Sequence, residues 1–588
     1  MTPRLLRFAA SAAAATMYIL AAGHTASTQQ PAQQVPGAIR SRITLVPVDV
    51  RVLDRDGAPV TDLRQEDFTI LEDGVPQKIG HFSFQRLSPE APGPARPSLR
   101  KELDASVEEQ RHRTFLIVLG RGRLQNWSGG YEAVIRFVRE QLLPQDKVAI
   151  AAWNRATDFT TDHARLVPLL GRLRDKHMWI EQRLRLRESG LEAVYGSKDI
   201  PERLQVEIDT LFDDETLRPR ELAAVRIRDE EGYENAMRRQ IDAVMERMLG
   251  ERRALSDPRL EDFFRIAALG QSTMATLYSS IEYLKYFDGE KHLILLNEGG
   301  IFLPRAEDDE GVAATASDAR VAVHTILTGG VPLDSFDMSQ GGPGSLSIGA
   351  SGRASPLSQT ALATATGPFG ALFAMGTMRT FATRSGGYFA VTERAARVFD
   401  RIDTATRAHY VLGYYPSHAN WDGDYRKIEV KVNRPRVKVA SRRGYFATDQ
   451  IVPFDRRQFL THLRIGWAGY YPGTIEDITL TLKARTERGD LVAEGTIDPS
   501  RLSFEPIEGI RGGEVDLAIF VGDRDGEIIG ERWQTISLKL GDESFRRATQ
   551  NGIPFTVRIP LKGTPRDVKA IVYDYASDLM GSAVSRVR

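Results

Sequence analysis

The most constraining feature of the sequence is a strand–helix–strand pattern between residues 113 and 153. Residues 115–119 (FLIVL) form an unbroken apolar run, which is typical of a strand buried on both faces of a parallel sheet. From Tyr131 the apolar residues recur with helical spacing, and Pro144 ends this helix. Residues 148–153 (VAIAAW) form a second apolar strand. This βαβ unit predicts a doubly wound, mostly parallel α/β sheet.

Composition limits the other possibilities. A chain of 588 residues is too long for one hydrophobic core and predicts about four domains. Lys plus Arg and Asp plus Glu both number 78, and this balance argues against a nucleic-acid or polyanion binder. The absence of cysteine excludes thiolate metal sites, redox dithiols, cysteine nucleophiles and a lipid anchor on a lipobox cysteine.

The N-terminus predicts export. Arg4 and Arg7 come just before and at the start of a short, Ala-rich apolar run that ends in small residues, and this pattern predicts a signal peptide over residues 1–27. An uncleaved membrane anchor is the alternative, but the run is short for a span of about 20 residues. Residues 28–42 form a polar tether, and no later segment is apolar enough to span a bilayer. We therefore expect a periplasmic, cell-surface or secreted protein.

Both ends of the remaining chain are patterned as β-sheet. Residues 43–86 alternate apolar and polar positions around turn signals such as Asp73-Gly74, which predicts a small β-module. Residues 87–112 are a Pro-rich and charged linker. Residues 408–448 contain further strands, which we expect to join the N-terminal module in one sandwich. Residues 452–588 alternate in the same way and predict a C-terminal β-sandwich domain.

Two motif groups give the chain a family resemblance. The first comprises residues 60–63 (VTDL), 66–68 (EDF) and 72–74 (EDG), and the second comprises residues 410–416 (YVLGYYP) and 442–447 (RRGYFA). Together with the strand at 115–119 they resemble the acidobacterial "VWFA-related" family, over roughly residues 43–447. The resemblance implies an exported bacterial protein in which residues 113–407 form a von Willebrand factor A-type α/β domain.

Two segments interrupt this expected domain. Residues 164–287 are long, charged and mostly helical, and we interpret them as an insertion that packs on the sheet, with a projecting partner-binding arm as the alternative. Residues 272–286 have the pattern of a returning core helix. Residues 339–370 are rich in Gly, Ser and Ala, which predicts a flexible loop.

The loop after the first strand departs from the family pattern. A-type domains carry Asp-x-Ser-x-Ser there, which holds Mg²⁺ through hard oxygen ligands. This chain has Gly120-Arg121-Gly122-Arg123-Leu124 instead, so we predict no metal and no other cofactor at this place. Glu298 retains an acidic residue after the strand at 291–296. The arginines can pair internally with Glu298 or capture an external carboxylate, and the sequence leaves both possibilities open.

These features lead to a functional hypothesis. We expect a non-enzymatic binding, adhesion or scaffold protein that recognises a protein partner, through a carboxylate, at the carboxyl edge of the sheet. The expected recognition residues are Arg121, Arg123, Asn126, Trp127, Ser128 and Glu298. An envelope-assembly or chaperone-like factor that uses exposed strand edges is the first alternative. A hydrolase with a helical lid is the second, although no catalytic motif is present in the sequence.

Overall fold

The computed structural model describes most of the chain from residue 45 onward, within one compact unit that spans Thr44–Arg588. The gaps are residues 95–96, 100–109, 126–127, 188–199, 201, 213–219, 222–257, 302, 304–305, 330–367, 393, 418–420, 449–455, 472, 508–509, 525–527 and 588. The predicted signal peptide, the tether, Asn126, Trp127 and much of the expected insertion therefore lie outside the described residues.

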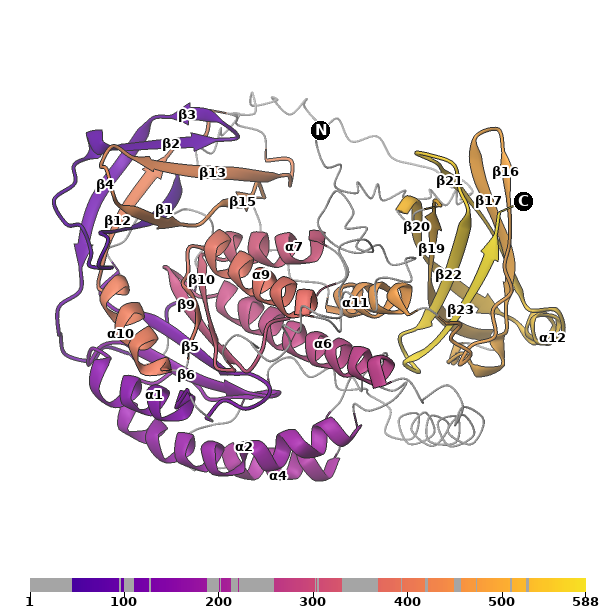
Figure 1. Ribbon diagram of the computed structural model, residues 1–588, viewed down its shortest axis with the longest axis horizontal. Coiled ribbons are helices and arrows are strands. Elements are labelled where there is room, and N and C mark those ends of the chain that lie inside the picture. The colour runs from indigo at the N-terminus through magenta and orange to yellow at the C-terminus, as the bar shows by residue number, and fades with distance from the viewer. Residues whose placement is uncertain are drawn as a thin grey trace, which may run out of the picture. The chain divides into compact units, whose positions relative to one another are not determined.

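A mostly parallel sheet is the centre of the α/β part (Figure 1). Its strand order is β11-β10-β9-β5-β6-β7-β8. The parallel strands are β5 (Thr114–Leu119), β6 (Lys147–Ala152), β9 (Lys291–Asn297), β10 (Val321–Leu327) and β11 (Phe389–Val391). Strands β7 (Arg155–Ala156) and β8 (Arg220–Glu221) are antiparallel additions at one edge. Strand β8 lies inside the segment that we had expected to be a helical insertion, so part of that segment belongs to the sheet.

Alternating residues of β5 contribute to two separate cores. Phe115, Ile117 and Leu119 pack on one face of the sheet, and Leu116 and Val118 pack on the other. Each such fully buried side chain contributes about 1.5–3 kcal/mol relative to an exposed one. This explains why an apolar run without alternation predicts a central strand.

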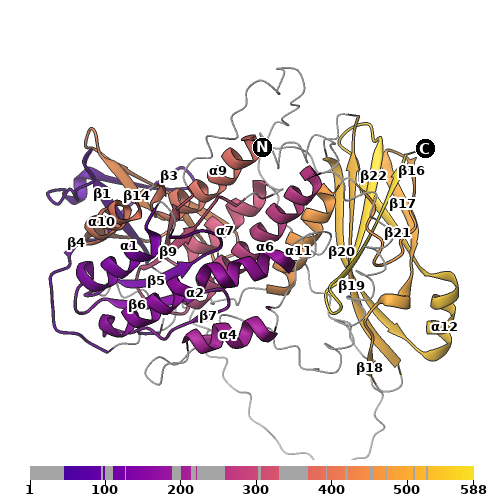
Figure 2. The same ribbon diagram turned by 60° about the horizontal axis from the view of Figure 1, so that its bottom comes forward.

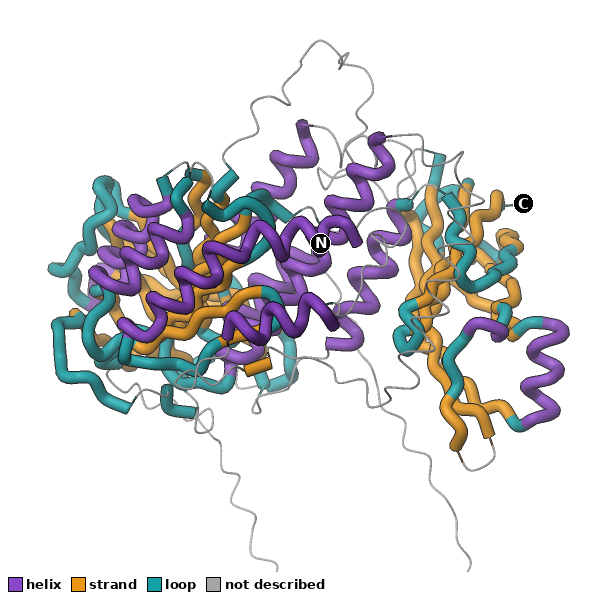
Figure 3. The backbone as a smooth tube through the Cα atoms, turned by 90° about the horizontal axis from the view of Figure 1, so that it is seen from below, coloured by secondary structure: helices purple, strands orange, loops and turns teal. Residues whose placement is uncertain are grey.

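Helices cover both faces of this sheet (Figures 2 and 3). One group packs in the core of Phe115: α1 (Gly130–Arg136), its π-helical continuation (Phe137–Gln141), α2 (Leu166–Arg187), α4 (Glu202–Phe212) and α10 (Ala395–Thr406). The other packs in the core of Leu116: α6 (Pro258–Lys285), α7 (Ala306–Asp318) and α9 (Pro368–Ser385). The core helix expected near residues 272–286 corresponds to the C-terminal part of α6. The flexible loop expected over residues 339–370 extends too far, because α9 begins at Pro368.

Strands from before and after the α/β part share one β-sandwich. Its first sheet has the order β14-β1-β12-β4 and its second β15-β13-β2-β3. The strands are β1 (Val46–Leu53), β2 (Phe68–Glu72), β3 (Val75–Gln77), β4 (Ile79–Arg86), β12 (Ala408–Tyr414), β13 (Tyr425–Val432), β14 (Lys438–Ser441) and β15 (Gly444–Phe446). Val48 pairs with Leu412 and Ile70 with Val430, so the orange strands of Figure 1 lie beside the indigo ones.

The C-terminal part contains two further antiparallel sheets. The strands are β16 (Lys483–Glu487), β17 (Asp490–Ile497), β18 (Glu505–Ile507), β19 (Ile510–Gly522), β20 (Ile528–Leu540), β21 (Ile553–Pro560), β22 (Asp567–Asp574) and β23 (Leu579–Arg586). Two helices accompany them that the strand pattern did not predict, α11 (Arg456–Tyr470) and α12 (Asp542–Asn551). The expected combination of an α/β part with several β-sheets is thus confirmed. In the described part of the chain, no helix is long and apolar enough to cross a membrane.

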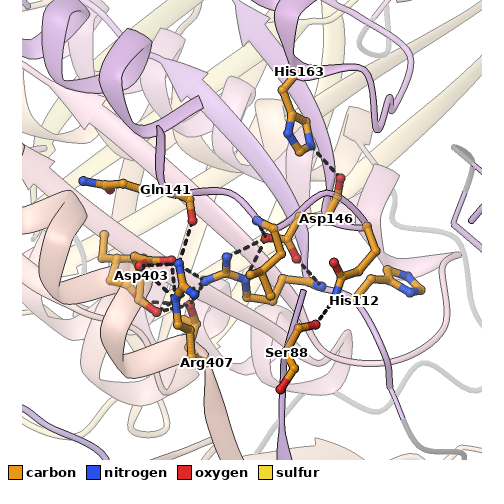
Figure 4. Close-up of polar contacts among 12 residues, drawn as sticks. Ser88, His112, Gln141, Asp146, His163, Asp403 and Arg407 are labelled. Carbon is orange, nitrogen blue, oxygen red and sulfur yellow. Dashed lines mark hydrogen bonds and ion pairs between the residues drawn. The ribbon is translucent and has the colours of Figure 1, made fainter. Parts of the chain in front are cut away.

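A buried ion-pair network fixes the amino end of β5 (Figure 4). Asp146 accepts hydrogen bonds from the Arg113 backbone N–H at 3.0 Å, from its Nε at 3.0 Å and from its Nη2 at 2.5 Å. Nη1 of Arg113 bonds Asp403 at 2.8 Å and Thr406 at 3.0 Å, which connects the network to α10. The Arg113 and Asp146 side chains are 2% and 0% exposed. The strand that carries the candidate site is therefore held firmly at its opposite end.

A second buried charge cluster joins the split sandwich to the α/β part. Asp49 of β1 accepts two hydrogen bonds from Nη2 of Arg320 at 2.9 and 3.0 Å, and Arg51 donates to Glu290 at 2.6 Å. His324 lies within hydrogen-bonding distance of His292, at 3.3 Å, in the same region. Burial, and then the nearby Arg51 charge, lower the pKa of His324 to about 3. This histidine is therefore neutral in the folded protein under ordinary conditions.

Candidate functional site at the carboxyl edge of the sheet

The apex loop, residues 120–124, follows β5 at the carboxyl edge of the parallel strands. Gly120 N–H donates to the Leu296 carbonyl at 2.8 Å, Arg121 N–H donates to Asn297 Oδ1 at 2.8 Å, and Glu298 N–H donates to the Arg121 carbonyl at 3.0 Å. A Cβ atom at residue 120 would lie 2.5 Å from Asn297 Oδ1, so only glycine allows this close approach. The apex loop is therefore closed onto the end of β9.

The Arg121 side chain points into the domain and is 8% exposed. Its Nε donates to both carboxylate oxygens of Glu181, at 2.9 and 3.0 Å. Its Nη1 donates to the Ser272 hydroxyl of α6 at 2.6 Å. A guanidinium held in this way cannot reach a partner. Arg121 is paired internally, but its carboxylate is Glu181 and not Glu298, the internal partner considered from the sequence.

Glu181 of α2 is the functional residue that the sequence did not reveal. Its side chain is fully buried, and besides Arg121 it accepts the Gly122 N–H at 2.8 Å and the Trp153 indole N–H at 2.9 Å. Burial alone would raise the pKa of Glu181, but the Arg121 charge, His177 and these donors outweigh it and lower the pKa. Glu181 is therefore a buried carboxylate that stays ionised.

His177, one turn before Glu181 on α2, supports the same loop. Its Nε2 lies 2.8 Å from the Gly122 carbonyl, which can only accept, so Nε2 carries the proton. The imidazole stacks on Trp153 at a centroid distance of 5.4 Å and meets Tyr131 edge-on at 5.4 Å. Trp153 has a left-handed backbone (φ 53°), a conformation that costs about 1–2 kcal/mol for a non-glycine residue. Contacts with His177 and Glu181 hold it there.

The outer part of the apex is an exposed ion pair. Arg123 Nε and Glu298 Oε1 are hydrogen-bonded, and the Arg123 N–H donates to Glu298 Oε2 at 3.0 Å. The Arg123 side chain is 55% exposed and that of Glu298 is 17% exposed. Gly122 has φ 89°, and a Cβ atom there would lie 2.3 Å from Glu298 Oε2. The glycine is therefore required both by its backbone angle and by the position of Glu298.

The four described residues of the six expected to form a recognition surface occupy different environments. Ser128 is 5% exposed, and its hydroxyl donates to the Leu124 carbonyl at 3.1 Å. Asn126 and Trp127 lie outside the described residues. Arg121 and Ser128 are thus internal, which corrects the expectation that they face a partner, because burial and internal hydrogen bonds already engage both. Arg123 and Glu298 are the described residues of this set at the surface.

The chemistry of the apex is that of two arginine–carboxylate pairs. Among the described residues, the carboxylates of Glu181 and Glu298 contact the apex loop, and each already pairs with a guanidinium. Within the ranges that the structure describes, no three His, Asp or Glu residues are grouped so that they could hold a metal ion. The exposed Arg123 guanidinium has N–H groups that can donate hydrogen bonds to a carboxylate or an amide oxygen.

Comparison with known proteins adds no assignment: neither a protein-family model nor a curated protein matches the chain.

Proposed function

We propose that this chain is an exported, non-enzymatic binding or scaffold protein whose α/β part is an A-type domain of the VWFA-related family. Parallel strands in the order β11-β10-β9-β5-β6, with helices on both faces, support the family assignment. The predicted signal peptide supports export. Binding takes place at the apex and does not need a metal ion.

One observation carries this proposal: the Arg121–Glu181 pair lies where an A-type domain would hold its ion. Its side chains are 8% and 0% exposed. Breaking a buried pair by removing one partner costs about 3–5 kcal/mol, so the inner pair is a fixed part of the domain. A built-in cation thus takes the structural role of the metal.

The outer pair is Arg123–Glu298, and in this pair a partner carboxylate can take the place of Glu298. The Arg123 side chain is 55% exposed, and ion pairs at the surface contribute about 0–1 kcal/mol, so a partner carboxylate can compete with the partly buried Glu298 for Arg123. The planar guanidinium can bind that carboxylate through two parallel hydrogen bonds. The partner class is therefore a protein that presents an Asp, Glu or C-terminal carboxylate.

The proposal is tested by affinity capture from an envelope extract with residues 28–588 as bait. Three baits are compared, each with and without EDTA: wild type, Arg123→Glu, and the matched control Arg136→Glu. Arg136 is also an exposed arginine paired with a carboxylate, but it lies on α1 and pairs with Asp400. The proposal expects capture that resists EDTA, persists in Arg136→Glu and is lost in Arg123→Glu.

Two outcomes would contradict the proposal. Capture abolished by EDTA would mean that a metal ion mediates binding. Capture that is unchanged in Arg123→Glu would move the binding surface away from the apex. The second result would favour the alternative of an envelope-assembly factor that binds through exposed strand edges.

A further inference from the structure

We infer that Glu181 is the positioning residue of the apex: it holds the apex loop from helix α2 and thereby leaves Arg123 as the cation that meets a partner. This inference deepens the proposed function and rests on it. Glu181 itself is buried and touches no partner.

The Glu181 carboxylate connects elements that are far apart in the sequence. Donors from two loops converge on the Glu181 carboxylate: Arg121 and Gly122 from the loop after β5, and Trp153 from the loop after β6. Through Nη1 of Arg121 the network also reaches Ser272 of α6. One side chain therefore joins two sheet loops to two helices.

Glu181 also balances the charge of the apex loop. Two guanidinium groups, Arg121 and Arg123, leave the apex loop on either side of Gly122. Glu181 neutralises the inner one and Glu298 the outer one. The Arg121 carbonyl accepts the Glu298 N–H at 3.0 Å, so Glu298, which follows β9, is a carboxylate residue directly beside Arg121. Without the charge of Glu181, Arg121 would compete with Arg123 for Glu298.

The hydrogen-bond pattern around residue 181 requires a carboxylate. Glutamine has the shape of glutamate, but one of its two terminal groups is an N–H donor. It cannot accept bonds from Arg121, Gly122 and Trp153 in the arrangement that Glu181 accepts them, because one of these donors would face another donor. Glu181→Gln therefore removes the charge and breaks the hydrogen-bond pattern while it keeps the volume.

The partner-independent test is hydrogen exchange of the full mature chain, measured on a peptide that contains residues 120–124. We compare wild type, Glu181→Gln and Glu132→Gln. Glu132 is a matched control because it also joins α2 through an ion pair, to Arg174, but at the surface. Loss of a charged, buried hydrogen bond predicts exchange at least about tenfold faster in the apex loop of Glu181→Gln. Glu132→Gln should match wild type.

The second readout separates positioning from general stability. If Glu181 acts through Arg123, the effects on capture affinity of Glu181→Gln and of Arg123→Lys, which keeps the charge but loses the planar fork and weakens capture without abolishing it, are not additive, and the double variant binds no worse than Arg123→Lys alone. A merely structural role predicts additive losses. All variants are compared at a temperature at which each is still folded, as shown by a complete cooperative unfolding transition when it is heated further.

The outcomes distinguish this inference from the proposed function. Apex exchange in Glu181→Gln that stays within about twofold of wild type, well inside the effect of one charged hydrogen bond, overturns the inference even if Arg123→Glu abolishes capture. Additive losses in the double variant also overturn it. If Arg123→Glu leaves capture intact while Glu181→Gln accelerates apex exchange, the proposed function fails and the positioning of the loop by Glu181 stands.

Discussion

The buried network around Arg113 allows a quantitative prediction about the strand that carries the apex. In Asp146→Asn the guanidinium keeps its contacts with Asp403 and Thr406 but loses the carboxylate that accepts hydrogen bonds from its Nε and Nη2, and that also accepts the Arg113 backbone N–H. Because both side chains are at most 2% exposed, water cannot replace that carboxylate. Removing one partner of such a pair should cost about 3–5 kcal/mol, a large fraction of the usual 5–15 kcal/mol stability of a domain.

Hydrogen exchange of β5 and β6 is the assay for this prediction, because it reports on this part of the chain alone. At about 1.4 kcal/mol per tenfold, the expected loss accelerates exchange of the slowest β5 and β6 amides by roughly 150-fold to several thousand-fold. The control is Asp400→Asn, which breaks an ion pair whose side chains are 41% and 48% exposed. Exposed pairs contribute about 0–1 kcal/mol, so its effect should stay below about tenfold.

A double variant tests the physical reason. Arg113→Met/Asp146→Leu removes both charges and leaves no buried guanidinium without its carboxylate. We expect it to be less destabilised than Asp146→Asn, since apolar replacement of a buried pair is often neutral or better. Asp146→Asn that exchanges no faster than Asp400→Asn, or a double variant that is clearly the less stable, would refute the reasoning.

Three further predictions concern other sites. Gly122→Ala should destabilise its loop more than Gly57→Ala destabilises its turn, because both glycines have positive φ (89° and 87°) but only a Cβ at residue 122 meets a neighbour. Hydrogen exchange of each loop in its own variant, relative to wild type, measures the difference. Burial lowers the pKa of His324 to about 3 in the folded chain, against about 6.5 in the unfolded chain, so the unfolded chain binds more protons between these values and the free energy of unfolding falls as pH falls through this window. His324→Gln should reduce this pH dependence in urea titrations at about pH 4 to 6.5. Lys569→Met removes the donor to the Ala468 and Gly473 carbonyls (2.9 and 3.4 Å), which should cost about 1–3 kcal/mol in urea unfolding followed by fluorescence of the buried Trp467.

The parts of the fold that follow from local pattern could be predicted from the sequence. The strands β5 and β6 are apolar at nearly every residue, and the helix between them has one apolar face, so their neighbours in sequence define them. The α11 and α12 helices were missed for the opposite reason. They lie within a region dominated by alternating strands, and α12 (DESFRRATQN) is too polar to show an apolar face.

The inner half of the candidate site could not be predicted, because its partners are distant in sequence. Arg121 and Glu181 are 60 positions apart, and Glu181 lies on a charged helix that resembles a solvated surface. The available signal was the helical spacing of His177 and Glu181 with the apolar residues Leu173, Ile180 and Leu184, which places two polar side chains on a buried face. The position of Arg123 and Glu298 at this edge of the sheet could be predicted, because Glu298 directly follows β9 and Arg123 lies in the short loop after β5.

The central claim is that the apex is held together, and binds, without a metal ion. The most direct test is equilibrium dialysis of the mature chain against Mn²⁺, for wild type and for Glu298→Gln. We expect no stoichiometric Mn²⁺ uptake that depends on the apex, because Arg121 already neutralises Glu181 and Arg123 already neutralises Glu298. Uptake of one Mn²⁺ per chain that Glu298→Gln abolishes would contradict it.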